Sequence, residues 1–211
     1  MDKFLTIRSE QGEWQQTIKK SQFIVNFMRI DDELAAKNFI NQICKEHYKA
    51  THNVFAYVIG DNDEIKRYSD NGEPSGTAGI PILEVLQRRQ VHNVAAVVTR
   101  YFGGIKLGAG GLIRAYAGTV AQGLNALGLV ERIFQLEVIL TIDYKNADAL
   151  TYWIKQNQYH MLDTTFDTAV HITIAIDEQK INAVEQTLKD KFSGNILFQI
   201  GQPTYLELPV Q

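Results

Sequence analysis

The chain has 211 residues, of which 45% are hydrophobic and 21% charged, so it can bury a sizeable core and is long enough for two modest domains. Its formal net charge of −3 excludes the overall basic character that is usual for proteins that bind nucleic acid non-specifically. Its one cysteine excludes an internal disulfide and a cysteine-rich metal site, and fits the reducing cytoplasm.

The N-terminal residues lack the apolar block of a signal peptide, and no stretch approaches the ~20 apolar residues of a membrane span. We therefore expect a cytoplasmic protein without a membrane partner.

The first half of the chain predicts an α/β domain over residues 1–132. Strands are expected where apolar side chains alternate or are β-branched, and helices where they recur three and four residues apart. Asp31 or Asp32 could cap the first helix, and Gly128 could end the third. The expected elements are strand 23–30, helix 34–49, a hairpin of strands 53–59 and 64–69, a helix around 82–86, a buried strand 94–99 and a helix 112–127.

The second half, residues 133–211, predicts the order βαββαβ, which is that of ferredoxin-like domains. The predicted elements are strand 135–142, helix 146–157, strands 161–167 and 169–176, helix 178–192 and strand 196–206. Residues 1–130 carry 15 Lys and Arg against 13 Asp and Glu, whereas residues 131–211 carry 6 against 11. An anionic partner would therefore prefer the first domain.

The strongest candidate site is the glycine-dense segment 99–114, which joins a buried strand to a helix. Glycines let backbone N–H groups approach a ligand, and a helix start carries partial positive charge, so this segment favours an oxyanion such as phosphate. Cationic side chains could hold the phosphate, and aromatic ones could stack on a base. The candidate residues here are Arg100, Tyr101, Phe102, Gly103, Gly104, Lys106, Gly108, Gly110 and Arg114.

The alternative is that these glycines only allow close packing of helix on strand and that the two aromatics belong to the core. That alternative leaves Arg100 and Lys106 unexplained. The segment also lacks the Walker and dinucleotide-binding spacings, so ATP or NAD bound through those motifs is not expected.

A second candidate is the polar loop 69–79. Asp70 and Glu73 could bind a divalent ion or act as acid and base, and Ser75 and Thr77 could donate to phosphate. The alternative is structural, since Asp, Asn and Gly are turn formers and Ser75 or Thr77 could cap the next helix.

The two histidines at positions 47 and 52 do not have the spacing of a zinc helix, and we expect no metal and no cofactor. His47 continues an apolar helical stripe, whereas His52 lies at a turn and could contact a ligand. Cys44 lies on the same apolar stripe, so we expect its thiol to be buried and inert. No catalytic set can be assigned from the sequence, and the chain is more in keeping with a binding protein than an enzyme.

Residues 97–111 and 69–81, with the shorter matches at 20–23 and 50–53, resemble the motifs of the IMPACT family. The resemblance implies an α+β fold, in which an N-terminal domain like the second domain of a small-subunit ribosomal protein precedes a ferredoxin-like domain like the last domain of elongation factor G. For eukaryotic relatives the resemblance implies regulation of translation, there with an additional N-terminal domain that we do not expect in this chain. Asn71 and Ile80 depart from the family pattern, which often has aspartate and arginine there.

Three functions are compatible with these observations. The first is a non-catalytic protein that binds RNA or the ribosome and is linked to regulation of translation. The second is an enzyme of the small-molecule-kinase branch, with the glycine-rich loop around a nucleotide phosphate and Asp70 or Glu73 as base or metal ligand. The third is a protein–protein interaction module that uses the acidic second domain.

Overall fold

The structure is a computed structural model that describes residues 3–60 and 62–210. Contacts divide them into an N-terminal unit, residues 3–132 with 208–210, and a C-terminal unit, residues 133–207. The last described residues, expected in the second domain, pack with the first unit because the Val210 N–H donates to the Leu129 carbonyl at 3.2 Å. Separate roles for the two domains stay a prediction.

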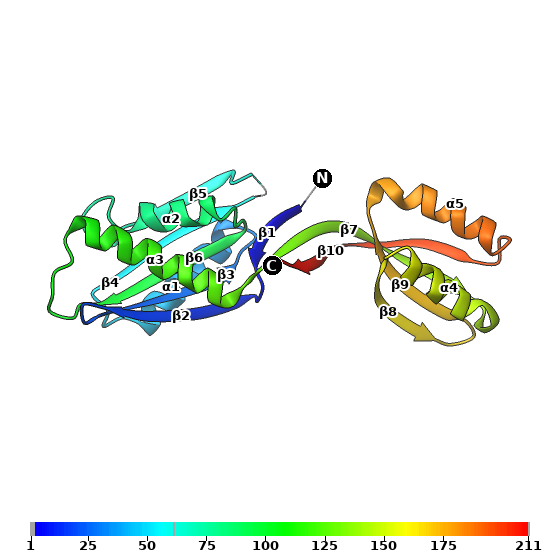
Figure 1. Ribbon diagram of the computed structural model, residues 1–211, viewed down its shortest axis with the longest axis horizontal. Coiled ribbons are helices and arrows are strands. Elements are labelled where there is room, and N and C mark those ends of the chain that lie inside the picture. The colour runs from blue at the N-terminus through cyan, green and yellow to red at the C-terminus, as the bar shows by residue number, and fades with distance from the viewer. Residues whose placement is uncertain (1–2, 61, 211) are drawn as a thin grey trace. The chain divides into compact units, whose positions relative to one another are not determined.

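The N-terminal unit contains a five-stranded antiparallel sheet in the order β2-β3-β6-β4-β5 (Figure 1). β6 lies at the centre and is buried on both faces, as its continuous apolar run predicts. Helices α2 and α3 pack against one face, and α1 packs against the other. The elements are β1 (Lys3–Ile7), β2 (Gln11–Ile18), β3 (Ser21–Arg29), α1 (Glu33–Glu46), β4 (His52–Ile59), β5 (Ile65–Ser69), α2 (Gly79–Arg88), β6 (Val94–Tyr101) and α3 (Ala109–Leu127).

Local signals explain several of these boundaries. Asp32 caps α1 by accepting from the Ala35 N–H at 2.7 Å, and Gly128 ends α3 with a φ of 76°. The β4–β5 hairpin has the expected pairing. β1 and β2 were not expected: β1 is short, and β2 is an edge strand whose partly exposed, mostly polar residues carry little hydrophobic pattern.

The C-terminal unit confirms the predicted order βαββαβ. Its strands lie in the order β10-β7-β9-β8, and the β7–β9 and β8–β9 pairs are antiparallel. Helices α4 and α5 pack against one face of the sheet, where alternate strand residues form the core. The elements are β7 (Leu129–Ile142), α4 (Tyr144–Gln156), β8 (His160–Phe166), β9 (Val170–Ile176), the short 3-10 helix Glu178–Lys180, α5 (Ile181–Lys191) and β10 (Leu197–Pro209).

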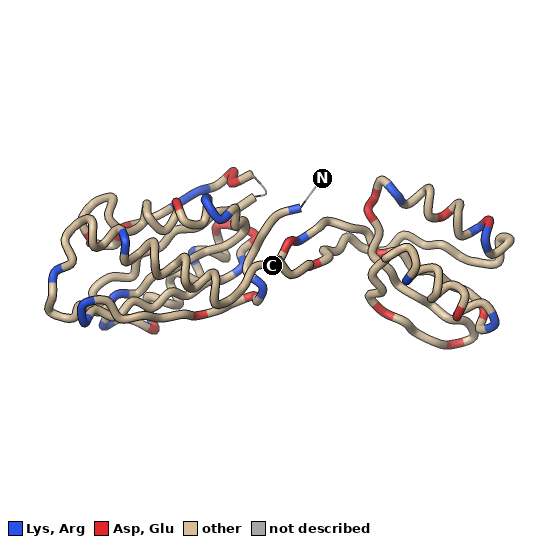
Figure 2. The backbone as a smooth tube through the Cα atoms, in the orientation of Figure 1, with Lys and Arg blue, Asp and Glu red and all other residues tan. Residues whose placement is uncertain are grey.

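The molecule is thus a mixed α+β protein. Acidic residues are spread along the elements of the C-terminal unit (Figure 2). Among the described residues, no helix is both long and apolar enough to span a lipid bilayer.

Candidate functional site

A cavity of about 380 Å³ opens in the N-terminal unit where β6 ends. The antiparallel register places Arg100, near the end of β6, opposite His52 at the start of β4. Two loops complete the walls, one leading from β5 to α2 and the other from β6 to α3. The lining residues are Thr51, His52, Glu73, Pro74, Arg100, Phe102, Lys106, Leu107, Gly108, Ala109 and Leu112.

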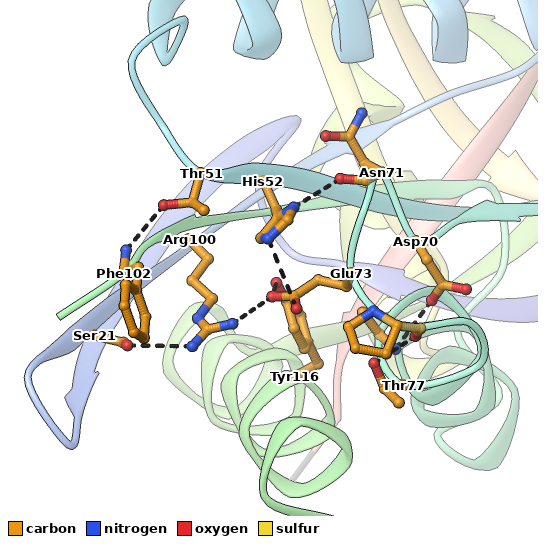
Figure 3. Close-up of polar contacts among 12 residues, drawn as sticks. Ser21, Thr51, His52, Asp70, Asn71, Glu73, Thr77, Arg100, Phe102 and Tyr116 are labelled. Carbon is orange, nitrogen blue, oxygen red and sulfur yellow. Dashed lines mark hydrogen bonds and ion pairs between the residues drawn. The ribbon is translucent and has the colours of Figure 1, made fainter. Parts of the chain in front are cut away.

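A buried ion pair forms one wall of this cavity. Arg100 Nη1 lies 2.6 Å from Glu73 Oε1, and the two side chains are only 6% and 3% exposed. The Tyr116 hydroxyl donates to the same Oε1 at 2.8 Å, so one carboxylate oxygen receives two hydrogen bonds (Figure 3). Ser21 Oγ lies 3.4 Å from Arg100 Nη2, and the guanidinium lies over the Phe23 ring. Burial is the main cause that raises the pKa of Tyr116, with the neighbouring carboxylate adding to it.

The ion pair changes the role expected for Arg100. A guanidinium whose charge is already matched by a buried carboxylate holds that carboxylate in position and is not a free phosphate ligand. The alternative in which the glycines serve only packing left Arg100 without a role. The ion pair with Glu73 now supplies that role. Arg100 Nε is nevertheless buried with no hydrogen-bond partner among the described residues, so a water or a ligand atom could still bind there.

His52 is fixed by the loop that follows β5. Its Nδ1 lies 2.8 Å from the Asn71 carbonyl oxygen. Its Nε2 points toward Glu73 Oε2, 3.8 Å away, so that Glu73 lies between Arg100 and His52 (Figure 3). His52, the histidine for which a ligand contact was expected, lines the cavity. His47 does not, and its Nδ1 lies 2.9 Å from the Tyr101 hydroxyl.

Asp70 organises the polar loop and does not face the cavity as a free carboxylate. It accepts from the backbone N–H groups of Gly76 at 2.8 Å, Ala78 at 3.1 Å and Gly79 at 2.8 Å, and thereby caps α2. The expectation that Ser75 or Thr77 caps this helix is wrong, because the Thr77 hydroxyl donates to the Pro74 carbonyl and α2 has no cap from its own N-cap side chain.

The glycine-rich loop leads into the N-terminus of the 19-residue helix α3. Its N-cap is Gly108, with a φ of 69°, and the first turn has neither a side-chain cap nor an acidic residue. Space around the α-carbons of Gly104 and Gly108 is open. Gly103 is different, because a Cβ there would collide with the backbone of Lys20. The loop therefore contains one glycine required by packing and two that leave the helix start accessible.

Cationic and aromatic side chains flank this helix start. Lys106 lines the cavity and has no ion-pair partner within the described part of the chain. Phe102 is 47% exposed, and its N–H donates to Thr51 Oγ1 at 3.0 Å. The exposed Arg114 lies on α3 outside the lining, and the Tyr101 hydroxyl is directed to His47.

Of the candidates predicted from the sequence, the cavity brings together His52, Glu73, Arg100, Phe102, Lys106 and Gly108. The structure places the remaining candidates outside the lining: Asp70, Ser75, Thr77, Tyr101, Gly103, Gly104, Gly110 and Arg114. Sequence reasoning missed Tyr116, which looked like an ordinary member of an apolar helical stripe. A tyrosine on such a stripe must find a partner for its hydroxyl, and that requirement was the available signal. Within the described residues, no group of three or more His, Cys, Asp or Glu side chains is arranged to hold a metal ion.

Comparison with known proteins places this chain in a family. The model of the Impact N-terminal domain matches residues 19–124, and a domain of unknown function (DUF1949) matches residues 140–195. The IMPACT family member YvyE of Bacillus subtilis is 42% identical over 98% of this chain and 95% of its own length. The chain belongs to the IMPACT family.

Other IMPACT relatives cover the chain to different extents. The IMPACT family member YigZ of Escherichia coli is 34% identical over 86% of this chain and 90% of its own length. The protein IMPACT homolog of Dictyostelium discoideum is 38% identical, but over 44% of this chain and 27% of its own length. A crystal structure described as that of a hypothetical protein aligns with a TM-score of 0.62 at 32% identity, covering 94% of this chain and 97% of the other.

Proposed function

We propose that this IMPACT protein is a non-catalytic RNA-binding protein of the cytoplasm, linked to regulation of translation, and that the cavity at the end of β6 is its RNA site. One observation carries the proposal: the positive end of α3 opens into a cavity that also contains Lys106 and the exposed Phe102. Backbone N–H groups at a helix start bind anions, and an accessible aromatic ring can stack on a base.

The charges at the site support this assignment despite the chain's net charge of −3. The first N–H groups of α3 have no capping side chain, so a phosphate oxygen can accept from them. Lys106 adds a full positive charge at the cavity, and the exposed Arg114 is available to a neighbouring phosphate of the same strand. The cavity volume of about 380 Å³ falls in the range of small-ligand sites, roughly 300–1,000 Å³.

The contacts of the two loop carboxylates argue against the kinase-type alternative. That mechanism needs Asp70 or Glu73 as a base or metal ligand. Asp70 accepts three backbone hydrogen bonds, and Glu73 is engaged by Arg100 and Tyr116. Carboxylate oxygens that already accept hydrogen bonds from the protein hold the loop in place, and they are not free to take a proton from a substrate or to bind a metal ion.

The link to translation is inferred from family and fold. The sequence motifs imply an N-terminal domain like that of a ribosomal protein and a C-terminal domain like the last domain of elongation factor G, and the order βαββαβ is consistent with the latter. Because likeness of fold does not establish function, direct binding measurements must decide.

The test is fluorescence anisotropy with a short single-stranded RNA at several salt concentrations. We expect binding that weakens as salt rises. Lys106→Ala should weaken binding and reduce the slope of log affinity against log salt by roughly 0.7, the value for one phosphate contact on a single strand. Phe102→Ala should cost about 1 kcal/mol, the low end for base stacking, since the ring is only half exposed.

Lys45→Ala is the matched control, because Lys45 is an exposed lysine in the last turn of α1 and outside the cavity lining. It should leave the affinity unchanged. The proposal is refuted if RNA does not bind at low salt, or if Lys106→Ala and Phe102→Ala behave like the control.

A further inference from the structure

The hydrogen bond between His52 and Asn71 determines which nitrogen of the imidazole carries a proton. Nδ1 lies 2.8 Å from the Asn71 carbonyl oxygen, and a carbonyl oxygen can only accept. Nδ1 must therefore donate. In the neutral ring, Nε2 is then left with a lone pair, and it is this nitrogen that points toward Glu73.

Glu73 presents a second acceptor to the same space. Its Oε1 receives hydrogen bonds from Arg100 and Tyr116, whereas Oε2 has no hydrogen-bond donor among the described residues. The distance of 3.8 Å between Oε2 and His52 Nε2 is longer than the ~2.7–2.9 Å of a charge-assisted hydrogen bond. His52 Nε2 and Glu73 Oε2 are therefore two acceptors that face each other across a gap. A hydrogen-bond donor on a bound ligand would satisfy them best.

The donors and acceptors of the cavity lie on different walls. Lys106 and the helix start supply positive charge and N–H donors, while His52 and Glu73 supply acceptors. A matching ligand combines an anionic phosphate with a nearby hydroxyl that can donate. A ribonucleotide has this combination, because its 2′-hydroxyl lies beside the phosphate, whereas a deoxyribonucleotide lacks the hydroxyl.

We propose that His52 Nε2 and Glu73 Oε2 bind a ribose 2′-hydroxyl and that this contact makes the site select RNA over DNA. The inference rests on the proposed RNA-binding function and adds the group that determines specificity. The hydroxyl has one proton, which the two acceptors share in a three-centre hydrogen bond. Losing that hydrogen bond is worth about a factor of ten in affinity. Glu73 acts here as an acceptor fixed by Arg100, and His52 as an acceptor fixed by the Asn71 carbonyl.

The experiment compares three oligonucleotides of one sequence: RNA, DNA with deoxyuridine in place of thymidine, and 2′-O-methyl RNA. The wild-type protein should bind RNA about tenfold more tightly than either of the others. The 2′-O-methyl group removes the donor while it keeps the oxygen, so it tests donation specifically. His52→Ala removes one of the two acceptors, so it should lower RNA affinity toward the DNA level and leave DNA affinity unchanged.

Two controls separate specificity from affinity. Lys106→Ala should weaken RNA and DNA by the same factor, because a phosphate contact is common to both. His160→Ala should change neither, since His160 is an exposed histidine of β8 in the C-terminal unit. His52→Phe retains a ring of similar size without an acceptor and should reproduce the effect of His52→Ala. The wild-type comparison of the three oligonucleotides needs no variant at all.

Each outcome decides between the two proposals. Failure to bind RNA and DNA alike would remove the proposed function itself. Equal affinity of the wild-type protein for all three oligonucleotides would leave the proposed function standing and overturn the 2′-hydroxyl contact. Selectivity of undiminished size in His52→Ala and His52→Phe would also overturn it. So would a preference that follows base identity at constant sugar, because that result would point to an amino group of a base as the donor.

Discussion

The buried Arg100–Glu73 pair should be the most sensitive point of the N-terminal unit. Arg100→Met removes the guanidinium and retains most of the aliphatic volume. Glu73, only 3% exposed, would then keep one hydrogen bond from Tyr116, with His52 at 3.8 Å. Breaking a buried pair by removing one partner costs about 3–5 kcal/mol. Because Tyr116 remains as a donor, we expect about 3 kcal/mol, or a fall in melting temperature of roughly 10 °C.

The assay is urea unfolding monitored by tryptophan fluorescence. The chain has two tryptophans, Trp14 in β2 and Trp153 in α4, so a Trp153→Phe background makes the signal report the N-terminal unit. The double variant Arg100→Met with Glu73→Gln should recover much of the loss, because it removes the unpaired buried charge.

Arg88→Met provides a matched control. The Arg88–Glu84 pair has nearly the same separation, 2.7 Å against 2.6 Å, but its side chains are 77% and 51% exposed. Its loss should cost under about 0.5 kcal/mol, as is usual for exposed helix pairs. If Arg100→Met costs no more than Arg88→Met, burial does not make the pair important, and the positioning role assigned to Arg100 is wrong.

Three further outcomes are expected. Gly103→Ala should destabilise the N-terminal unit severely, because the added Cβ would collide with the Lys20 backbone. Gly104→Ala should cost only about 1 kcal/mol, since the φ of 84° is strained for alanine but the surroundings are open. The melting temperatures of the two variants test this difference. Asp70→Ala removes the acceptor of three backbone N–H groups and should lower stability by about 2 kcal/mol in urea unfolding. Burial raises the pKa of Tyr57 from 10 to about 12, so the stability that its protonated form contributes is complete below pH 10 and is lost as the pH rises through 12. An ultraviolet titration should show this late ionisation of the phenol. Tyr57→Phe should abolish this part of the pH dependence of stability.

The sequence predicts elements where a single periodicity runs the length of the element. The stripe of α1 and the apolar run of β6 are such cases, and so is the order of the C-terminal unit. The end of α3 at Gly128 was predicted from a different local signal, the preference for glycine at a helix C-terminus. The sequence did not predict β2, because an edge strand with one face in solvent needs few apolar residues. The register of β2 is determined by its pairing with β3.

The contacts of the site were harder to predict because they join distant positions. Arg100 and Glu73 are 27 residues apart, and neither has a local pattern that names the other. Asp70 caps a helix that begins nine residues later, so local cap rules pointed to the closer Ser75 and Thr77. Phe102 and Lys106 were found from the sequence because cationic and aromatic residues around a glycine-rich helix start form a local pattern.

The ion pair also determines what kind of selectivity the cavity can have. Since Glu73 matches the charge of Arg100, the uncompensated positive charge at the cavity reduces to Lys106 and the start of α3. A site with so little net charge cannot hold RNA by charge alone, and its affinity should depend on salt only weakly, with a slope near that of one or two phosphates. Selectivity must then come from the fixed acceptors His52 and Glu73. Glu73 is held by the buried hydrogen bond from Tyr116, which salt does not screen, and His52 by its hydrogen bond to the uncharged Asn71 carbonyl. Raising the salt concentration should therefore weaken RNA and DNA binding together and leave their ratio unchanged.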